Sequence, residues 1–177
     1  MILGPYEYRS LRKKRWYAVY TRSRYERKVY CRLLKENIEC FMPTYKTIRQ
    51  WSDRKKRVEL PLFTSYVFVC TREVDAYIIS LTEGIVRFVS FEGRPAEIPL
   101  YQIENLKILS QAETEIEKTT QSFAPGQKVT VATGKLKGLI GELVRIGRKN
   151  RLLIRVEHIS QNLLIEVPAS ALEGEIF

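Results

Sequence analysis

A polar segment at residues 111–122 divides this sequence into two parts of different character, and it constrains the fold more than any other feature. The segment has a single large apolar residue, Ile116, and its composition is typical of a linker. Long apolar runs and helical patterns alternate before it, whereas only short apolar runs follow it. We therefore predict two domains, at residues 15–110 and 123–177, after a flexible basic lead-in at residues 1–14.

The first part combines strand and helix patterns. Residues 60–71 would present apolar side chains on both faces of a strand. We therefore expect a central strand with helices covering one face and a partner covering part of the other. Ser23 and Glu26 have the capping-box spacing at a helix start. Pro43 indicates an edge or a bulge. Strands are expected at 16–21, 40–51 and 85–89, a charged hairpin tip at 52–57, and helices at 23–38, 73–81 and 99–112; together they predict an α+β fold with helices packed on a sheet.

The second part has the pattern of a small all-β domain. Its apolar runs are short, alternate with polar residues and end at polar or Gly-containing turns, which is typical of a small β-barrel. The runs lie at residues 128–131, 139–146, 151–159 and 163–167.

The charge distribution favours a polyanionic partner. Thirty Lys and Arg residues oppose twenty Asp and Glu, and residues 1–60 alone carry 17 basic and 6 acidic groups. Nucleic acid and an anionic membrane surface are the two candidates. No apolar run approaches the length of about 18 to 20 residues that a spanning helix needs, and the N-terminus does not resemble a signal peptide. Three scattered cysteines fit reduced thiols, so we expect a cytoplasmic protein. We also expect a monomer that does not bind membranes.

No enzyme, metal or cofactor signature is found. The only histidine, His158, lies in an expected strand without a nucleophile or an orienting partner nearby. One histidine and three dispersed cysteines do not form a zinc ligand set. Residues 134–138 (GKLKG) lack the order of a phosphate-binding loop. We therefore expect no catalytic residue, no metal and no cofactor.

Three motifs, in the right order, resemble the NusG family of transcription elongation factors over nearly the whole chain. The first is Trp16-Tyr17-Ala18-Val19 before a helix. The second is PLFTSYVFV at 61–69, similar to the family's F-P-G-Y-V strand, after Met42-Pro43-Thr44. The third looks like the KOW motif, with PGQKV at 125–129 followed by Gly134, Lys135, Gly138 and Gly141.

Some details are more similar to the specialised RfaH-like and UpxY-like paralogs, which act on selected operons. IECFMP at 38–43 and PAEIP at 95–99 are of that type. Two features depart from the pattern. Thr64-Ser65 replaces the usual Pro-Gly or Pro-Asn pair, and Asp75-Ala76-Tyr77-Ile78 stands where RfaH-like proteins carry a threonine-rich patch that contacts the polymerase gate loop.

The resemblance implies an NGN-like N-terminal domain, an antiparallel sheet with flanking helices, joined by a linker to an SH3-like KOW β-barrel. It implies a factor that binds the β′ clamp helices of RNA polymerase, bridges towards the β subunit, and suppresses pausing and termination. The KOW domain would recruit a second factor, either Rho or a small-subunit ribosomal protein. The residues at the family's polymerase-binding positions are Tyr20, Phe63, Tyr66, Phe68, Phe91, Ile103 and Leu106.

A basic helix face is the second candidate surface. Arg22, Arg32 and Lys35 match positions that contact the non-template DNA strand in RfaH-like paralogs, and Arg24 belongs to the same face. The neighbouring Tyr25 could stack on unpaired bases. The run Arg54, Lys55, Lys56 and Arg57 at the hairpin tip is either a contact with upstream duplex DNA or a solvated turn.

An alternative function belongs to a different class. KOW barrels also occur in RNA-binding and ribosome-associated proteins, so the C-terminal part alone does not decide between the two. The N-terminal pattern of Trp16, Phe63 and Tyr66 favours the transcription factor, because proteins that consist of the barrel alone lack it.

Overall fold

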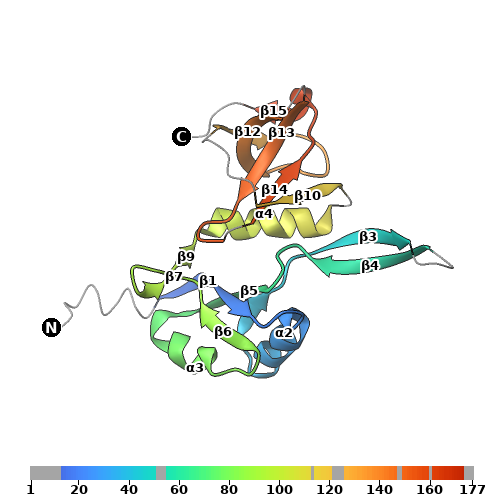
Figure 1. Cartoon of the computed structure of the whole chain (residues 1–177). Helices are drawn as coiled ribbons and strands as arrows, with labels where there is room; N and C mark the ends of the chain where they lie inside the picture. The colour runs from blue at the N-terminus through green and yellow to red at the C-terminus, as the bar shows by residue number, and fades with distance from the viewer. Residues whose placement is uncertain are drawn as a thin grey trace. The chain divides into compact units, whose positions relative to one another are not determined.

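The computed structural model describes residues 13–50, 55–112, 114–120, 126–146, 149–159 and 161–173 (Figure 1). The chain forms two compact units. The first comprises Met1–Met42 with Phe63–Pro99, and the second comprises Pro43–Leu62 with Leu100–Phe177. The predicted α+β class is confirmed. No helix in the described parts of the chain has both the length and the apolar character needed to cross a membrane.

An antiparallel sheet forms the centre of the first unit. Its strands follow the order β2-β5-β1-β6, and a short strand β9 also pairs with β1. A separate small hairpin consists of β7 (Ser90–Phe91) and β8 (Arg94–Pro95). The sheet strands are β1 (Lys14–Thr21), β2 (Glu39–Phe41), β5 (Tyr66–Arg72), β6 (Ile85–Phe88) and β9 (Glu97–Ile98).

Two helices cover one face of this sheet. They are α2 (Glu26–Lys35) and α3 (Ala76–Ser80), the latter preceded by the 3₁₀ turn η1 (Glu73–Asp75), and Figure 1 shows both on the same side. The core between helices and sheet is apolar, which is what alternation along the strands predicts. Its members are Tyr17, Val19, Val29, Leu33, Val67, Val69, Ala76, Ile79 and Phe88.

The predicted capping box at the start of α2 is wrong. The helix begins at Glu26, its N-cap is Tyr25, and no side chain caps it. Glu26 is buried instead, and its Oε1 accepts a hydrogen bond of 2.7 Å from the backbone N–H of Ser65. Ser65 has a φ of 66°, so the carboxylate stabilises a left-handed turn at the Thr64-Ser65 position, where the resemblance implies Pro-Gly or Pro-Asn.

Two long strands expected from the sequence are each divided. The stretch 40–51 becomes β2 and β3 (Thr44–Gln50), with a break at Pro43, whose carbonyl accepts a hydrogen bond from Leu62 N at 2.7 Å. The stretch 60–71 becomes the end of β4 (Lys55–Pro61) and all of β5 except its last residue, Arg72. β3 and β4 form a two-stranded hairpin in the second unit. Of the expected tip at 52–57, residues 52–54 lie outside the described residues, whereas 55–57 belong to strand β4.

The second unit also contains a helix and a six-stranded antiparallel sheet. The sheet order is β10-β14-β13-β12-β11-β15, and the predicted short strands are confirmed. Strand β10 lies within the segment predicted as a linker and pairs with β14, so that segment is partly ordered. The elements are α4 (Leu100–Gln111), β10 (Ile116–Thr119), β11 (Gln127–Val131), β12 (Ile140–Ile146), β13 (Lys149–Arg155), β14 (Asn162–Ile165), the 3₁₀ turn η2 (Ala169–Ala171) and β15 (Leu172–Glu173).

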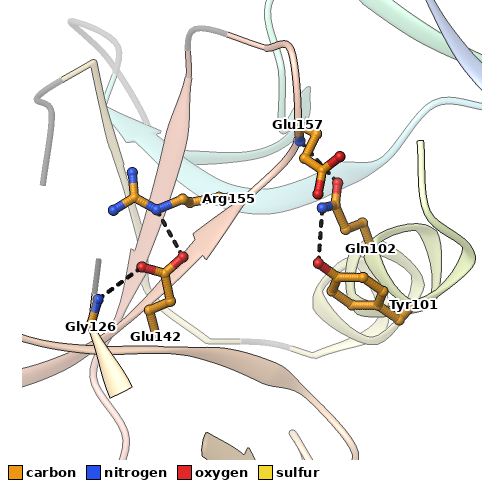
Figure 2. Close-up of polar contacts among 6 residues, drawn as sticks. All are labelled: Tyr101, Gln102, Gly126, Glu142, Arg155 and Glu157. Atoms are coloured by element: carbon orange, nitrogen blue, oxygen red, sulfur yellow. Dashed lines mark hydrogen bonds and ion pairs between the residues drawn. The ribbon is translucent and has the colours of Figure 1, made fainter. Parts of the chain in front are cut away.

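Polar side chains join α4 to this sheet. Asn105, which is buried, accepts a hydrogen bond from Ile140 N at 2.9 Å and donates one to Ile140 O at 2.7 Å. Gln102 accepts a hydrogen bond from Glu157 N at 2.9 Å and donates one to the Tyr101 hydroxyl, as Figure 2 shows. Buried amides are tolerated where both of their ends are satisfied, so these bonds fix the register of α4 on the sheet.

Candidate functional site

Three side chains form a row across the first sheet, on the face opposite α2 and α3. Tyr66 on β5 lies beside Tyr20 on β1, and Tyr20 lies beside Arg87 on β6. The two rings pack edge to face with centroids 5.3 Å apart, and the Arg87 guanidinium lies 5.8 Å from the centre of the Tyr20 ring. Because Val19 and Val67 point into the core, the alternation of a strand places the tyrosines on the other face. We call these three residues the tyrosine row.

The tyrosine row combines apolar area with polar ends. Both tyrosines are half-buried, and Arg87 is exposed. Burial raises the pKa of Tyr66, the neighbouring Tyr20 raises it further, and Arg87 acts in the opposite direction. The Tyr66 phenol is therefore neutral at physiological pH and can donate a hydrogen bond. Rigid aromatic side chains with one polar tip, next to an arginine, have the composition of the energetic centre of a protein–protein interface.

The other predicted polymerase-binding residues differ in accessibility. Phe63 and Phe68 pack edge to face at 6.0 Å and are only 1% and 0% exposed. Ile103 and Leu106 are fully buried as well, whereas Phe91 is 58% exposed on β7. These four buried side chains are part of the core in this structure, so only Tyr20, Tyr66 and Phe91 offer surface to a partner.

Of the four cations predicted for the basic face at α2, three are exposed and one is anchored. Arg22, Arg24 and Lys35 are exposed. Arg32 donates two hydrogen bonds of 2.6 Å to Glu83, one to its carbonyl and one to its carboxylate. Arg32 therefore holds a turn of the chain against the helix and is less available to a ligand than the other three.

The turn held by Arg32 is shaped by Gly84. Its φ of 100° is unfavourable for other residues, and a Cβ atom there would lie 2.9 Å from both Tyr25 and Val29. The sequence alone could not reveal the pairing of Arg32 with Glu83, because 51 residues separate the two. It also missed Arg87, and it did not reveal that the Nζ of Lys28 lies 4.4 Å from the centre of the Tyr25 ring.

The remaining predicted cations lie at the hairpin. Arg54 is outside the described residues, and Lys55, Lys56 and Arg57 belong to β4. The side chains of all four lie outside the described part of the structure, so their role stays a prediction.

The KOW-like residues form the connection between β11 and β12. Gly134 and Gly138 have φ values of 82° and 87°, a left-handed backbone that favours glycine. Lys135 is exposed between them. Gly141 lies in β12, where a Cβ atom would come within 2.6 Å of Leu152 and 2.7 Å of Ile154. The glycines thus have two physical roles, turn geometry and close packing.

His158 does not lie in a strand as predicted. It is exposed in a turn after β13, with a φ of 62°. Within the described residues, no group of three or more His, Cys, Asp or Glu side chains is arranged to hold a metal ion.

Comparison with known proteins identifies the family. A family model described as "Transcription termination factor nusG" matches residues 14–107, which is more than half of the chain. The chain belongs to the NusG family. The region matched includes the tyrosine row and α2.

Two NusG-family relatives cover almost the whole chain. Both are named transcription termination/antitermination protein NusG. The protein of Staphylococcus epidermidis is 29% identical over 174 residues, covering 90% of this chain and 95% of its own length. The protein of Rickettsia typhi is 22% identical over 166 residues, covering 87% of this chain and 86% of its own length. Among solved structures, "Domain interaction in Thermotoga maritima NusG" aligns with 93% of this chain at 21% identity and a TM-score of 0.49.

Membership in the NusG family settles the broad function. The family consists of non-enzymatic transcription factors, and the relatives are named for termination and antitermination. The chain is therefore a transcription elongation or termination factor and not an enzyme.

Proposed function

We propose that this protein binds the β′ clamp helices of RNA polymerase through the tyrosine row, with a further contact to the β subunit, and acts as an antitermination factor in selected operons. The observation that carries the proposal is the accessible pair of Tyr20 and Tyr66 on the sheet face that α2 and α3 leave uncovered. Phe91, exposed on β7, supplies a second aromatic anchor. Family membership supports polymerase as the partner.

The chemistry of the tyrosine row suits a helical partner. Two edge-packed rings offer a rigid apolar surface, and each phenol oxygen can bond a polar group of the partner. Arg87 adds a planar cation that can pair with a carboxylate at the rim of the contact. A partner with an apolar stripe and acidic residues beside it would satisfy all three side chains.

Two further contacts belong to the proposal. The exposed Arg22, Arg24 and Lys35 would attract the non-template DNA strand in the transcription bubble. The C-terminal sheet, as an SH3-like KOW barrel, would recruit a second factor, either Rho or a small-subunit ribosomal protein. Suppression of pausing follows if these contacts hold the polymerase clamp closed.

Titration of the protein with a β′ fragment that carries the clamp helices tests the proposal. The double variant Tyr20→Ala, Tyr66→Ala should bind at least tenfold more weakly, a loss of about 1.4 kcal/mol or more. The matched control is Tyr77→Ala, Leu81→Ala, which removes two large side chains that are 75% and 66% exposed on the α3 side. The control should bind like the native protein.

The outcome that contradicts the proposal is equal affinity of the folded double variant and the control. Circular dichroism establishes that the variants are folded. Recovery of ribosomes without polymerase in a pull-down from cells would favour the alternative, a KOW-containing RNA-binding or ribosome-associated protein.

A further inference from the structure

A hollow in the second unit collects three lysines that have no assigned role. Its volume is about 540 Å³, within the range of ligand-binding sites. One lysine comes from the β3–β4 hairpin and two from the connection between β11 and β12, while the last turn of α4 forms the floor. The lining residues are Lys46, Ile108, Gln111, Ala112, Lys135 and Lys137. We call this hollow the lysine groove.

The backbone of the β11–β12 connection directs two lysines outward. Leu136, between them in sequence, is only 9% exposed and anchors the connection. Lys137 N donates to Gly134 O at 3.2 Å, which closes a tight turn. Gly138 has a left-handed backbone, and a Cβ atom there would be in ordinary van der Waals contact with the Ile108 side chain, at 3.7 Å. Lys135 and Lys137 are therefore exposed on either side of a buried anchor.

The third lysine of the groove is Lys46. It reaches the hollow because contacts at the base of the β3–β4 hairpin hold that hairpin in place. Lys118 on β10 donates a hydrogen bond of 2.5 Å to Pro61 O, and its Nζ lies 4.5 Å from the centre of the Tyr45 ring. Burial lowers the pKa of Lys118, so its surroundings are partly shielded from water. The neighbour of Tyr45 along β3 is Lys46, which thereby keeps a fixed place at the groove.

The described acidic residues compensate the positive charge of the lysine groove only in part. Among the residues that the structure describes, no acidic side chain lines the groove itself. Glu59, opposite Lys46 in the hairpin, accepts a hydrogen bond from Thr44, and Glu117 forms an ion pair with Arg151. Glu115 lines a neighbouring hollow that Lys46 also borders. The C-terminus of α4 contributes roughly half a negative charge, which offsets only a small part of three cations.

We propose that the lysine groove binds the phosphodiester backbone of a single-stranded nucleic acid. Three flexible ammonium groups suit a chain of phosphates, which needs point charges rather than one rigid geometry. The aliphatic floor of Ile108 and Ala112 can contact a sugar or an unstacked base, and the Gln111 amide can bond a base edge. The site is separate from the α2 face and does not require polymerase binding.

Binding of the full-length protein to the 12-mers oligo(U) and oligo(dT), measured at several salt concentrations, tests the proposal. The variant Lys46→Gln, Lys135→Gln, Lys137→Gln should lose about three phosphate contacts, so its salt slope should decrease by roughly 2 and its affinity should fall at least tenfold. The control is Lys13→Gln, Lys14→Gln, Lys128→Gln, which removes the same charge from exposed positions outside the groove.

A lysine footprint gives an independent readout. With oligonucleotide bound, amine-reactive reagents should modify Lys46, Lys135 and Lys137 more slowly, and the three control lysines at the native rate. If the groove variant loses equal affinity for oligo(U) and oligo(dT), the ligand is the phosphodiester backbone common to both. If it loses more affinity for oligo(U), the ligand is a transcript. Both results support the site. Equal salt slopes for the groove variant and its control, or no protection, would overturn it.

Discussion

At the scale of single residues, burial separates side chains that the sequence shows as equivalent. Phe63, Tyr66 and Phe68 occupy one motif, yet only Tyr66 retains accessible area. Apolar character was predictable for all three, because the motif is apolar at every position except Thr64 and Ser65. Accessibility was not predictable, because it depends on which ring packs against which neighbour after folding.

The cysteines give a prediction at this scale. The Cys40 thiol donates to Tyr30 O across 3.7 Å, and its pKa is raised from 9.0 to about 11, first by burial and then by Cys31 and Glu39. Cys31 is exposed. Because the thiolate is the nucleophile, iodoacetamide at pH 8 should alkylate Cys31 at least ~10-fold faster than Cys40. Peptide mass spectrometry measures both rates, and similar rates in the folded protein would contradict the expectation.

The same pKa predicts how stability depends on pH. The folded value lies above the unfolded one, so the stabilising contribution is complete below about pH 9 and is lost as the pH rises through about 11. In Cys40→Ala this part of the alkaline decline in stability should be absent, which urea unfolding at pH 8 and pH 10.5 can measure.

At the scale of elements, the sequence predicted where strands and helices lie better than how they begin and end. The apolar periodicity of α2 was sufficient to identify the helix, but Glu26 contacts Ser65 rather than capping the helix. Strand β10 was missed because its segment contains one large apolar residue, Ile116. Pairing with β14 supplies the order that the composition of this segment does not indicate.

The α2 face allows a second test by salt dependence, now in polymerase complexes that carry an open bubble. Replacing Arg22, Arg24 and Lys35 by Gln should flatten the dependence of log K on log salt by about 2 units, at roughly 0.7 for each lost phosphate contact. Polymerase without DNA should bind this variant as it binds the native protein. An unchanged slope would show that the face is merely solvated.

Arg32→Gln should act on the structure of the protein more than on its contacts with DNA. Arg32 is held by Glu83, so this substitution should loosen the turn around Gly84 and affect DNA binding less than the loss of an exposed cation. The comparison separates ligand contacts from structural ones on the same helix.

At the scale of the whole molecule, the sequence predicted a β-rich region after residue 110 but not how the chain groups into compact units. Strands β10 to β15 form a six-stranded sheet in that region. The sequence did not indicate that the β3–β4 hairpin belongs to the same compact unit as that region. Such long-range grouping depends on contacts like that of Lys118 with Pro61, which local patterns do not encode.

Action on selected operons is the prediction for the whole molecule. An arginine such as Arg22 can read a base edge as well as a phosphate, which would restrict the protein to particular exposed sequences. Transcript sequencing with and without the protein should show longer transcripts beyond terminators or pauses in a few operons only. A uniform effect across all genes would instead indicate a general elongation factor.

The pairing of β10 with β14 also limits the length of free chain between α4 and the C-terminal strands. Only residues 112–115 separate α4 from β10, and four extended residues span at most about 14 Å. If β10 separates from β14, the free stretch grows to residues 112–126, with a reach of roughly 50 Å. Once the hydrogen bonds of Asn105 and Gln102 to the sheet are broken, four residue pairs between β10 and β14 therefore limit how far strands β11 to β15 can move from α4.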